Sequence, residues 1–348
     1  MLQHNRKKWG TMSENRVTIA DVADALGLST ATVSNVIHGK TKKISEETVK
    51  RVQEKLEEMN YIPNMAGILL AQNNSKIIGV VINDGPKYEG NVLEDGFVMA
   101  SLNALLKEVN KSGHFLMIKA TRHCAEIPAF ASMWNMDGMI LMGFCEAEYR
   151  KLRENMRVSF VVYDGYFEET DRIVNLVIDH YDGGYQAGRY LKDTGNCKAL
   201  CLSDNYICMD AERIEGFKKA FAPGEVDVMQ IPIKKEERQI FYKEHLEEIK
   251  KYRAVFAVSD YYALDFMHFV QKEGIRVPED MSIIGFDDSM MSRENVPSLT
   301  TIHQDAQIRA KTAINLLEAM RKGEKVEKKI TLPVNLIIRD STRNEGQI

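Results

Sequence analysis

The stretch VTIADVADALGLSTATVSNVIHG, residues 17–39, contains two short amphipathic helix patterns joined by a tight turn. In the first, Thr18 and Asp21 have the spacing of an N-terminal capping box. Apolar residues then recur every three or four positions as far as Gly27, which can end a helix with a positive φ. The second pattern begins at Ser29, a preferred N-cap residue, and ends at the next glycine.

A third helix pattern, SEETVKRVQEKLEEMN, follows at residues 45–60. Two helices joined by a tight turn and braced by a third predict a helix-turn-helix unit. The outward residues of the second helix are short and uncharged: Thr30, Ala31, Thr32, Ser34 and Asn35. Such side chains can reach phosphates and base edges without repelling the phosphates, so they indicate DNA binding. The alternative is a three-helix domain whose outer face is merely solvated.

The composition is that of an ordinary globular protein of two to three domains, with 348 residues, 44% apolar and 28% charged. Apolar runs are too short for a membrane helix, and no apolar segment follows the basic N-terminus. The five cysteines show no CxxC spacing, which favours free thiols over a zinc site or disulfides. We therefore expect a cytoplasmic protein.

Charge is unevenly distributed along the chain. Residues 1–43 carry seven Lys/Arg and three Asp/Glu, whereas the remainder carries 39 and 47. A basic N-terminal segment before an acidic body is consistent with a local DNA contact.

From Lys76 onward, short β-rich runs such as IIGVVI, GMILM and SIIG alternate with amphipathic helix patterns. This alternation predicts an α/β fold with parallel sheets, and about 270 residues are too many for one such sheet. No dinucleotide fingerprint, phosphate loop or HExxH motif is present. The stretch GGYQAG, residues 183–188, lacks the dinucleotide spacing and favours close helix packing instead. Five of the six histidines in the body show no metal-ligand spacing and are interpreted as structural or surface residues: His123, His180, His245, His268 and His303.

Several motifs together resemble the LacI/GalR family of bacterial transcription regulators. The N-terminal run quoted above is followed by ISEETVKRVQEKLEEMNYIPNMAGILLA, and SIIGFDDS, PSLTTIHQD, AINLLEAM and LPVNLIIRDST stand in the family's order near the C-terminus. The resemblance covers residues 17–342. It implies a small all-α helix-turn-helix head followed by a two-lobed body like that of periplasmic sugar-binding proteins.

The resemblance also implies DNA-contacting positions. Thr30, Ala31 and Asn35 match base-reading residues, and Thr18, Ser29, Thr32 and Ser34 match phosphate-contacting residues. Asn64 lies among the DNA-contacting positions of the linker, and Leu70 matches the leucine that wedges into a minor-groove base step. In the family this linker becomes helical only on operator DNA; here Gly67 replaces a usual alanine, which disfavours the helix further.

The expected domain boundaries follow from these matches. The head spans residues 17–61, the linker 62–75 and the effector-binding and dimerisation domain 76–345. Its first lobe is placed at about 76–175 and 303–332, and its second at about 176–302 and 333–345. A ligand is expected between the lobes, at the carboxyl ends of the strands.

Five residues are candidates for binding the effector: Asp164, Arg213, Ser259, Asp260 and Asp287. Arg213 and Asp287 match cleft positions of the family, whereas Ser259 replaces a usual asparagine. Carboxylates that accept from vicinal hydroxyls, and an arginine that donates, suit a polyhydroxylated ligand. The structural alternatives are a turn residue at 287, a surface ion pair for Arg213, a strand-end cap at 164 and a helix N-cap at 260. Six aromatic residues near strand ends could stack on a sugar: Tyr163, Tyr166, Phe167, Tyr206, Tyr261 and Tyr262.

These observations predict a homodimeric transcriptional regulator that represses sugar-utilisation genes by binding a near-palindromic operator and responds to a small-molecule effector, with no cofactor or metal. Three alternatives remain: a sugar-binding protein without a role in DNA regulation, an enzyme on an α/β scaffold, and a regulator controlled by a protein partner. No nucleophile–base pair or metal cluster in the sequence supports the enzyme.

Overall fold

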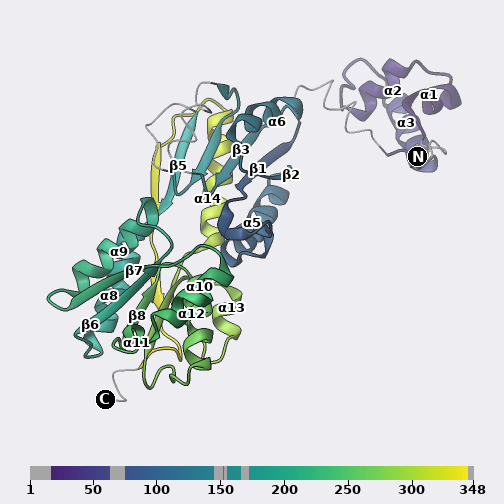
Figure 1. Ribbon diagram of the computed structural model, residues 1–348. Helices are drawn as coiled ribbons and strands as arrows, with labels where there is room; N and C mark the ends of the chain where they lie inside the picture. The colour runs from purple at the N-terminus through teal and green to yellow at the C-terminus, as the bar shows by residue number, and fades with distance from the viewer. Residues whose placement is uncertain (1–16, 63–74, 145–151, 153–154, 166–171, 344–348) are drawn as a thin grey trace, which may run out of the picture. The chain divides into compact units, whose positions relative to one another are not determined.

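The computed structural model describes residues 17–62, 75–144, 152, 155–165 and 172–343. It divides the chain into two compact units, Met1–Asn73 and Asn74–Ile348. Figure 1 shows the helical first unit and the α/β second unit. The two units are described separately below.

The first unit is the predicted three-helix head. It consists of α1 (Ile19–Leu26), α2 (Thr30–Ile37) and α3 (Glu46–Glu58). Five apolar residues from the three helices form its buried core: Val22, Ala23, Val33, Val36 and Val52. The capping box is present, because the Thr18 hydroxyl accepts from the backbone N–H of Asp21 while the Asp21 carboxylate accepts from the backbone N–H of Thr18. The prediction of a helix-turn-helix head is confirmed.

The second unit contains two six-stranded sheets, each at the centre of one lobe. The first sheet has the order β11-β5-β4-β3-β1-β2, and all of its pairs are parallel. Its strands are β1 (Ile77–Asn83), β2 (Phe115–Thr121), β3 (Gly138–Met142), β4 (Phe160–Tyr163), β5 (Ile173–Ile178) and β11 (Lys329–Leu332). Helices α5 (Gly96–Lys111) and α14 (Ala306–Arg321) contribute to the core on one face, and α6 (Ile127–Met133) contributes to that on the other.

Short 3-10 helices lie beside this first sheet: η1 (Pro86–Tyr88), η2 (Val92–Glu94) and η3 (Cys124–Glu126). Strand β1 is buried along almost its whole length, as a strand covered on both faces should be.

The second sheet has the order β12-β10-β9-β8-β6-β7. Its strands are β6 (Lys198–Ser203), β7 (Glu225–Gln230), β8 (Ala254–Ala257), β9 (Ser282–Asp287), β10 (Thr300–His303) and β12 (Asn335–Ile337). Only β12 runs antiparallel to its neighbour. The surrounding helices are α8 (His180–Asp193), α9 (Cys208–Phe221), α10 (Lys235–Glu244), α11 (Leu246–Ile249), α12 (Asp260–Lys272) and α13 (Met290–Glu294).

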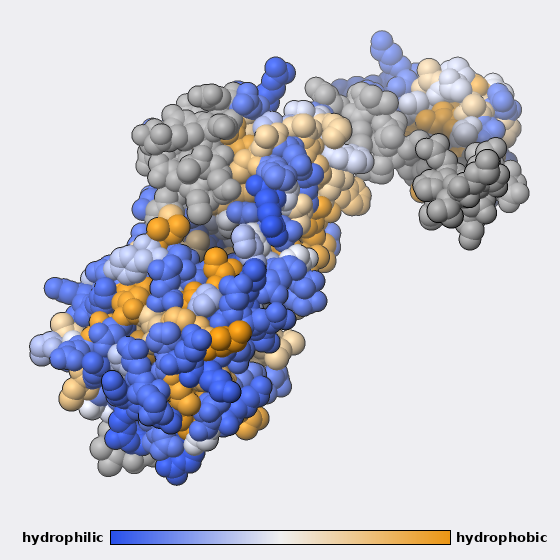
Figure 2. All heavy atoms as spheres, viewed as in Figure 1, coloured by the Kyte–Doolittle hydropathy of each residue, from blue (hydrophilic) through white to orange (hydrophobic). Residues whose placement is uncertain are grey.

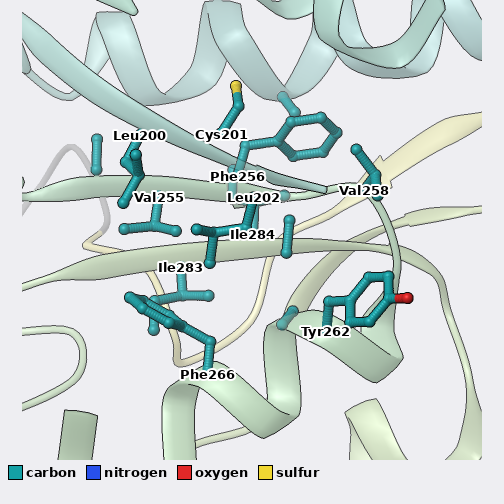
Figure 3. Packing of buried hydrophobic residues seen from close by; sticks show 14 of the residues in the cluster. Leu200, Cys201, Leu202, Val255, Phe256, Val258, Tyr262, Phe266, Ile283 and Ile284 are labelled. Carbon is teal, nitrogen blue, oxygen red and sulfur yellow. The ribbon is translucent and has the colours of Figure 1, made fainter. Parts of the chain in front are cut away.

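Figure 3 shows how the core of the second lobe is packed. Side chains from β6, β8 and β9 interleave, among them Leu202, Phe256 and Ile284, and all three are fully or almost fully buried. Phe266 of α12 packs onto the sheet from the side opposite Cys201. This continuous apolar core holds the carboxyl ends of the strands in fixed positions.

The chain crosses between the two sheets three times: from β5 to α8, from β10 to α14, and from β11 to β12. The sequence predicts the first lobe boundary at about residue 175. The chain leaves the first sheet a few residues later, because β5 pairs with β11 as far as Ile178. Likewise His303 still pairs with Asp287 in the second sheet, so the second crossing begins only after it. The residues at these crossings therefore lie between the lobes.

The glycines of GGYQAG bring α8 and α9 into backbone contact. A Cβ on Gly184 would overlap the carbonyl oxygen of Arg213, and a Cβ on Gly188 would lie 2.5 Å from the carbonyl oxygen of Phe217. On the facing helix, a Cβ on Gly216 would overlap the carbonyl oxygen of Tyr181. This arrangement agrees with the prediction of close helix packing, and it fixes Arg213 near the start of α8.

In the part of the chain that the structure describes, no helix combines the length and the apolar character needed to cross a membrane.

Candidate functional site

The predicted DNA-reading residues lie on one exposed face of the head. Thr30, Ala31 and Asn35 of α2 are exposed, and Thr32 and Ser34 are half-buried beside them. The first turn of α2 contains no acidic residue. Because helix N-termini favour anions, this end of α2 suits a phosphate backbone.

The phosphate-contacting candidates also hold helix ends. The Ser29 hydroxyl accepts from the backbone N–H of Thr32 at 3.1 Å and bonds the Thr32 hydroxyl at 2.8 Å. Thr18 caps α1 in the same way, and its hydroxyl donates to Asp21 at 2.7 Å. Both residues are exposed, so each can fix its helix and still reach a ligand. Asn64 and Leu70 lie outside the described residues.

In the second unit, Arg213 is buried behind the carboxyl ends of the strands of the second lobe, with 5% of its surface exposed. Its Nε donates to Nδ1 of His180 at 3.2 Å, and Nη1 donates to the carbonyl oxygen of Val258. The guanidinium lies over the Phe286 ring, 3.7 Å from its centroid, a cation–π arrangement. Arg213 is therefore not a surface ion pair, although Nη1 lies 4.0 Å from Asp210.

Asp287 lies at the end of β9 and has φ 120°, a backbone conformation rare for residues with a Cβ. Its Oδ1 accepts from Nε2 of Gln304 at 2.7 Å. Burial raises the pKa of Asp287 well above the usual value, while the charge of Arg213 opposes that rise. Strained backbone and a displaced pKa occur together at many ligand sites.

The first lobe adds charged groups that sequence reasoning did not single out. Lys87 of η1 lies 4.6 Å from the centroid of the Tyr88 ring. The surrounding protein alone would lower the pKa of Lys87, but Tyr88, Asp95 and Asp210 outweigh that effect and raise it. Asp210 belongs to the other lobe, and burial raises its pKa. We call this set the interlobe cluster: Lys87, Tyr88, Asp95, Asp210, Arg213 and Asp287.

Direct contacts hold the lobes together beside this cluster. The backbone N–H of Lys235 in the second lobe donates to Glu89 of the first at 3.2 Å. Gly96, at the start of α5, is so close to Ser289 that a Cβ would lie 2.9 Å from the Ser289 Cβ. The two lobes therefore meet beside the interlobe cluster, in which Lys87 is exposed and Arg213 is buried.

Asp164 follows β4 in the first lobe and is buried. Its Oδ1 accepts from Nη2 of Arg309 at 2.7 Å and from Nε2 of His180 at 2.9 Å. Burial raises the pKa of Asp164, but Arg309 and His180 outweigh it and hold that pKa well below the usual range. The carboxylate therefore anchors other side chains and does more than cap a strand.

Ser259 and Asp260 stand at the start of α12. Ser259 is the N-cap, and its hydroxyl accepts from the backbone N–H of Tyr262 at 3.4 Å, so the alternative that placed the cap at Asp260 is wrong by one residue. The buried Asp260 carboxylate accepts from the backbone N–H of Ser289 at 2.7 Å and from the Thr301 hydroxyl at 2.5 Å. Burial raises its pKa to about 6. With both oxygens bonded within the protein, Asp260 positions the strand ends near Asp287.

The aromatic candidates fall into different environments. Tyr163 and Tyr262 are buried, whereas Tyr206 and Tyr261 are exposed; Tyr166 and Phe167 lie outside the described residues. In the described ranges, no group of three or more His, Cys, Asp or Glu side chains is placed to hold a metal ion.

The interlobe cluster can donate and accept hydrogen bonds to a polar ligand at once. Arg213 and Lys87 supply donors, and Asp210 and Asp287 supply carboxylate oxygens. Sequence reasoning missed Lys87 and the contacts of His180, because neither residue belongs to a motif. The partners in the other lobe or across a crossing, such as Asp210 for Lys87 and Asp164 for His180, are distant in the chain.

Two family models match the chain. One describes bacterial regulatory proteins of the lacI family and matches residues 18–64. The other describes a periplasmic binding protein-like domain and matches residues 196–342. Together they cover the head and most of the second lobe.

Relatives match over nearly the whole length. The HTH-type transcriptional repressor PurR of Vibrio cholerae serotype O1 is 28% identical over 343 residues, covering 94% of this chain and 98% of the relative. The structure of the lac repressor dimer bound to operator and the anti-inducer ONPF superposes with a TM-score of 0.78 at 23% identity, covering 94% of this chain and 99% of that chain. A LacI transcriptional regulator from Alkaliphilus metalliredigens, complexed with D-xylulofuranose, superposes with a TM-score of 0.66 at 25% identity and covers 77% of this chain and 100% of that chain. The chain therefore combines a helix-turn-helix domain of the bacterial lacI regulatory family at its head with a periplasmic binding protein-like domain in its body.

Proposed function

We propose that this protein is a homodimeric transcriptional repressor whose affinity for operator DNA is controlled by a small polar effector that binds at the interlobe cluster. The observation that carries the proposal is the convergence of Arg213 and Asp287 of one lobe with the charged groups of the other. A molecule bound to both lobes changes how they sit together, and affinity at one site then depends on occupancy of the other.

The head, residues 17–61, is the DNA-binding part of the proposal. Each protomer would place α2 in a major groove, so two heads would read the half-sites of a near-palindrome. Thr30, Ala31 and Asn35 are the base-reading residues, because they are the exposed side chains of the first turns of α2. The linker, residues 62–75, would connect each head to its body.

The proposed effector is a carbohydrate. Arg213 donates from a buried guanidinium, and Asp287 and Asp210 accept; vicinal hydroxyls satisfy both kinds of partner. The relative from Alkaliphilus metalliredigens, whose structure contains D-xylulofuranose, supports this class.

A purine base is the second candidate effector, because the relative from Vibrio cholerae carries the name PurR. Ring N–H groups could donate to Asp287 and a ring carbonyl could accept from Arg213.

Calorimetry separates the two effector classes. Full-length protein is titrated with neutral pentoses, hexoses and disaccharides in one series and with hypoxanthine and guanine in the other. The isosteric Asp287→Asn variant is the matched control, and it should weaken binding of a true cleft ligand at least tenfold. Binding of bases alone would overturn the carbohydrate assignment, and binding of neither class would overturn both.

The surface of the first lobe supports a homodimer. Exposed apolar side chains gather on η2, α5 and the edge strand β2: Leu93, Met99, Leu106, Phe115 and Ile118. Figure 2 shows orange and pale orange residues along this flank. A clustered apolar surface of this kind marks a protein interface. Sedimentation should give a dimer, and Leu106→Glu should shift it towards monomer; a monomeric wild type would contradict the proposal.

A further inference from the structure

A chain of buried polar side chains runs from the second lobe through the crossings to the first. Arg213 bonds His180, and His180 bonds Asp164, with distances of 3.2 and 2.9 Å. His180 is the first residue of α8, directly after the crossing from β5. Arg213, His180 and Asp164 are all at least nine-tenths buried. The crossing is therefore occupied by a side chain that contacts both lobes.

A second branch uses the next crossing. Nε2 of Gln304 donates to Asp287 at 2.7 Å, and Oε1 of Gln304 accepts from Nη1 of Arg309 at 3.2 Å. Nη2 of Arg309 then donates to Asp164 at 2.7 Å and to the carbonyl oxygen of Leu176 at 2.9 Å. The two branches start from two proposed effector-binding residues and meet at one carboxylate of the first lobe.

The contacts fix the tautomer of His180. The Arg213 Nε–H can only donate, so Nδ1 of His180 must accept and carries no proton. The ring proton then sits on Nε2 and donates to Asp164. Protonation of Nδ1 would set an N–H against the Arg213 N–H, so this geometry requires a neutral imidazole.

We infer that His180 is a positioning residue that orients the Arg213 guanidinium and, with Gln304, transmits the state of the interlobe cluster to Asp164 in the first lobe. The inference rests on the proposed function, because it describes how that site would regulate DNA binding. Neither residue needs to touch the effector. His180 and Gln304 each make one hydrogen bond to a residue of the first lobe and one to a residue of the second. These hydrogen bonds must therefore change when the lobes move relative to each other.

The surroundings of His180 support this assignment. The charged groups that face the ring are Asp164 from the end of β4, Arg213 from α9 and Arg309 from α14. The Phe286 ring lies 6.1 Å away, centroid to centroid. Burial lowers the pKa of His180 to about 4, with Arg213 and Arg309 acting in the same direction and Asp164 against it.

NMR of the full chain with ¹⁵N-labelled histidine tests the contact geometry without any effector. The His180 signal is identified by its loss in His180→Gln. It should report a neutral Nε2–H tautomer from pH 8 down to about pH 5, and Arg213→Leu should raise the pKa of His180. An Nδ1–H tautomer, or ordinary titration near pH 6.5, would overturn the inference.

Operator affinity tests the transmission. The probe is the duplex that the wild type selects from random DNA. His180→Asn offers an acceptor near the Nδ1 position but is too short to reach Asp164, whereas His180→Gln offers a donor near the Nε2 position and loses the acceptor. We expect both variants, and Gln304→Leu, to change the Kd for the duplex at least threefold without effector.

The matched control is His268→Gln, because His268 bonds Asn295 at 2.8 Å on the exposed surface. It should leave the Kd within about 1.5-fold. Combining His180→Gln with Arg213→Leu should add nothing to the larger single effect, since both cut the same branch. Wild-type affinity in folded His180 variants, or additive effects in the double variant, would overturn the transmission. Failure of the wild type to select any duplex would instead refute the proposed function, and the NMR result would still decide the contact geometry.

Discussion

The carbonyl oxygen of Arg213 occupies the space into which a side chain at Gly184 would project. Helices α8 and α9 therefore meet through bare backbone, and the guanidinium of Arg213 emerges beside His180, one turn before Gly184. Because Gly184 has no side chain, the two helix backbones can approach closely, and this contact positions Arg213, a proposed ligand-binding residue.

Gly184→Ala should consequently push α9 away from α8. Overpacking a tight interior contact costs about 1–3 kcal/mol, and here the obstacle is backbone that cannot rotate away. Urea unfolding would measure the loss. Gly85→Ala serves as the control, because nothing lies within 4 Å of a Cβ there; equal stabilities for the two variants would contradict the packing argument.

Asn35→Ala and Thr32→Ala should affect DNA binding in different ways. Asn35 is exposed and able to reach a base edge, so its loss should relax the preference at one half-site position, at a cost of about 1–3 kcal/mol. Thr32 is half-buried beside the Ser29 cap, so its loss should weaken all sequences alike. Selection from random DNA measures both; an unchanged consensus for Asn35→Ala would remove that residue from base reading.

Leu70→Ala should weaken operator binding at least tenfold, because a wedge into a base step stabilises the bent duplex. Effector binding by the free protein should not change. Fluorescence anisotropy with operator and calorimetry with effector measure the two properties separately. Wild-type operator affinity would refute the wedge.

Arg213→Ala should abolish the response to effector while DNA binding persists. Arg213→Lys should restore little, because a lysine lacks the fork that donates to His180 and Val258 together. The measurement is operator affinity with and without a ligand identified by calorimetry. A normal response in Arg213→Ala would exclude this residue from the site.

Two histidines should give stability opposite dependences on pH. Burial lowers the pKa of His180 to about 4 in the folded chain. Between pH 6.5 and 4, His180 is therefore protonated in the unfolded chain and neutral in the folded chain. Stability should fall by on the order of 3 kcal/mol as the pH drops from about 6.5 to 4. The pKa of His303 is raised, first by its hydrogen bond to Asp288, so its contribution is complete below pH 6.5 and is lost as the pH rises through the folded pKa.

Urea midpoints at several pH values distinguish the two histidines. His180→Gln should flatten the decline between pH 6.5 and 4. His303→Gln should leave that decline unchanged and should instead flatten the loss of stability above pH 6.5. If His180→Gln left the slope unchanged, the neutral buried imidazole would be the wrong description.

The head could be predicted from the sequence because its signals are local. Thr18, Asp21 and Ser29 cap helices only a few residues away, and the apolar period of α1 to α3 sets their packing. The glycines at 183–188 were likewise interpreted correctly as a packing surface, since small residues at helical spacing permit little else.

The site was less predictable because its contacts are non-local. His180 was interpreted as structural or surface, for nothing in the sequence places residue 180 beside residues 164 and 213. The sequence offers Asp260 as an effector-binding carboxylate or a helix N-cap, and it gives no sign that the oxygens of Asp260 bond the backbone of Ser289 and the hydroxyl of Thr301. Motifs identify which residues meet at the strand ends, whereas the hydrogen-bond partners decide what each of them does.

The three crossings of the chain between the two sheets have a genetic consequence. Because α14 and β11 return to the first sheet after β10 has completed most of the second, neither lobe corresponds to a contiguous gene segment. A premature stop after Ile302 would remove α14 and β11 from one lobe and β12 from the other in a single event. Recombination should therefore exchange the whole body as one cassette, and the head as another, but never one lobe alone.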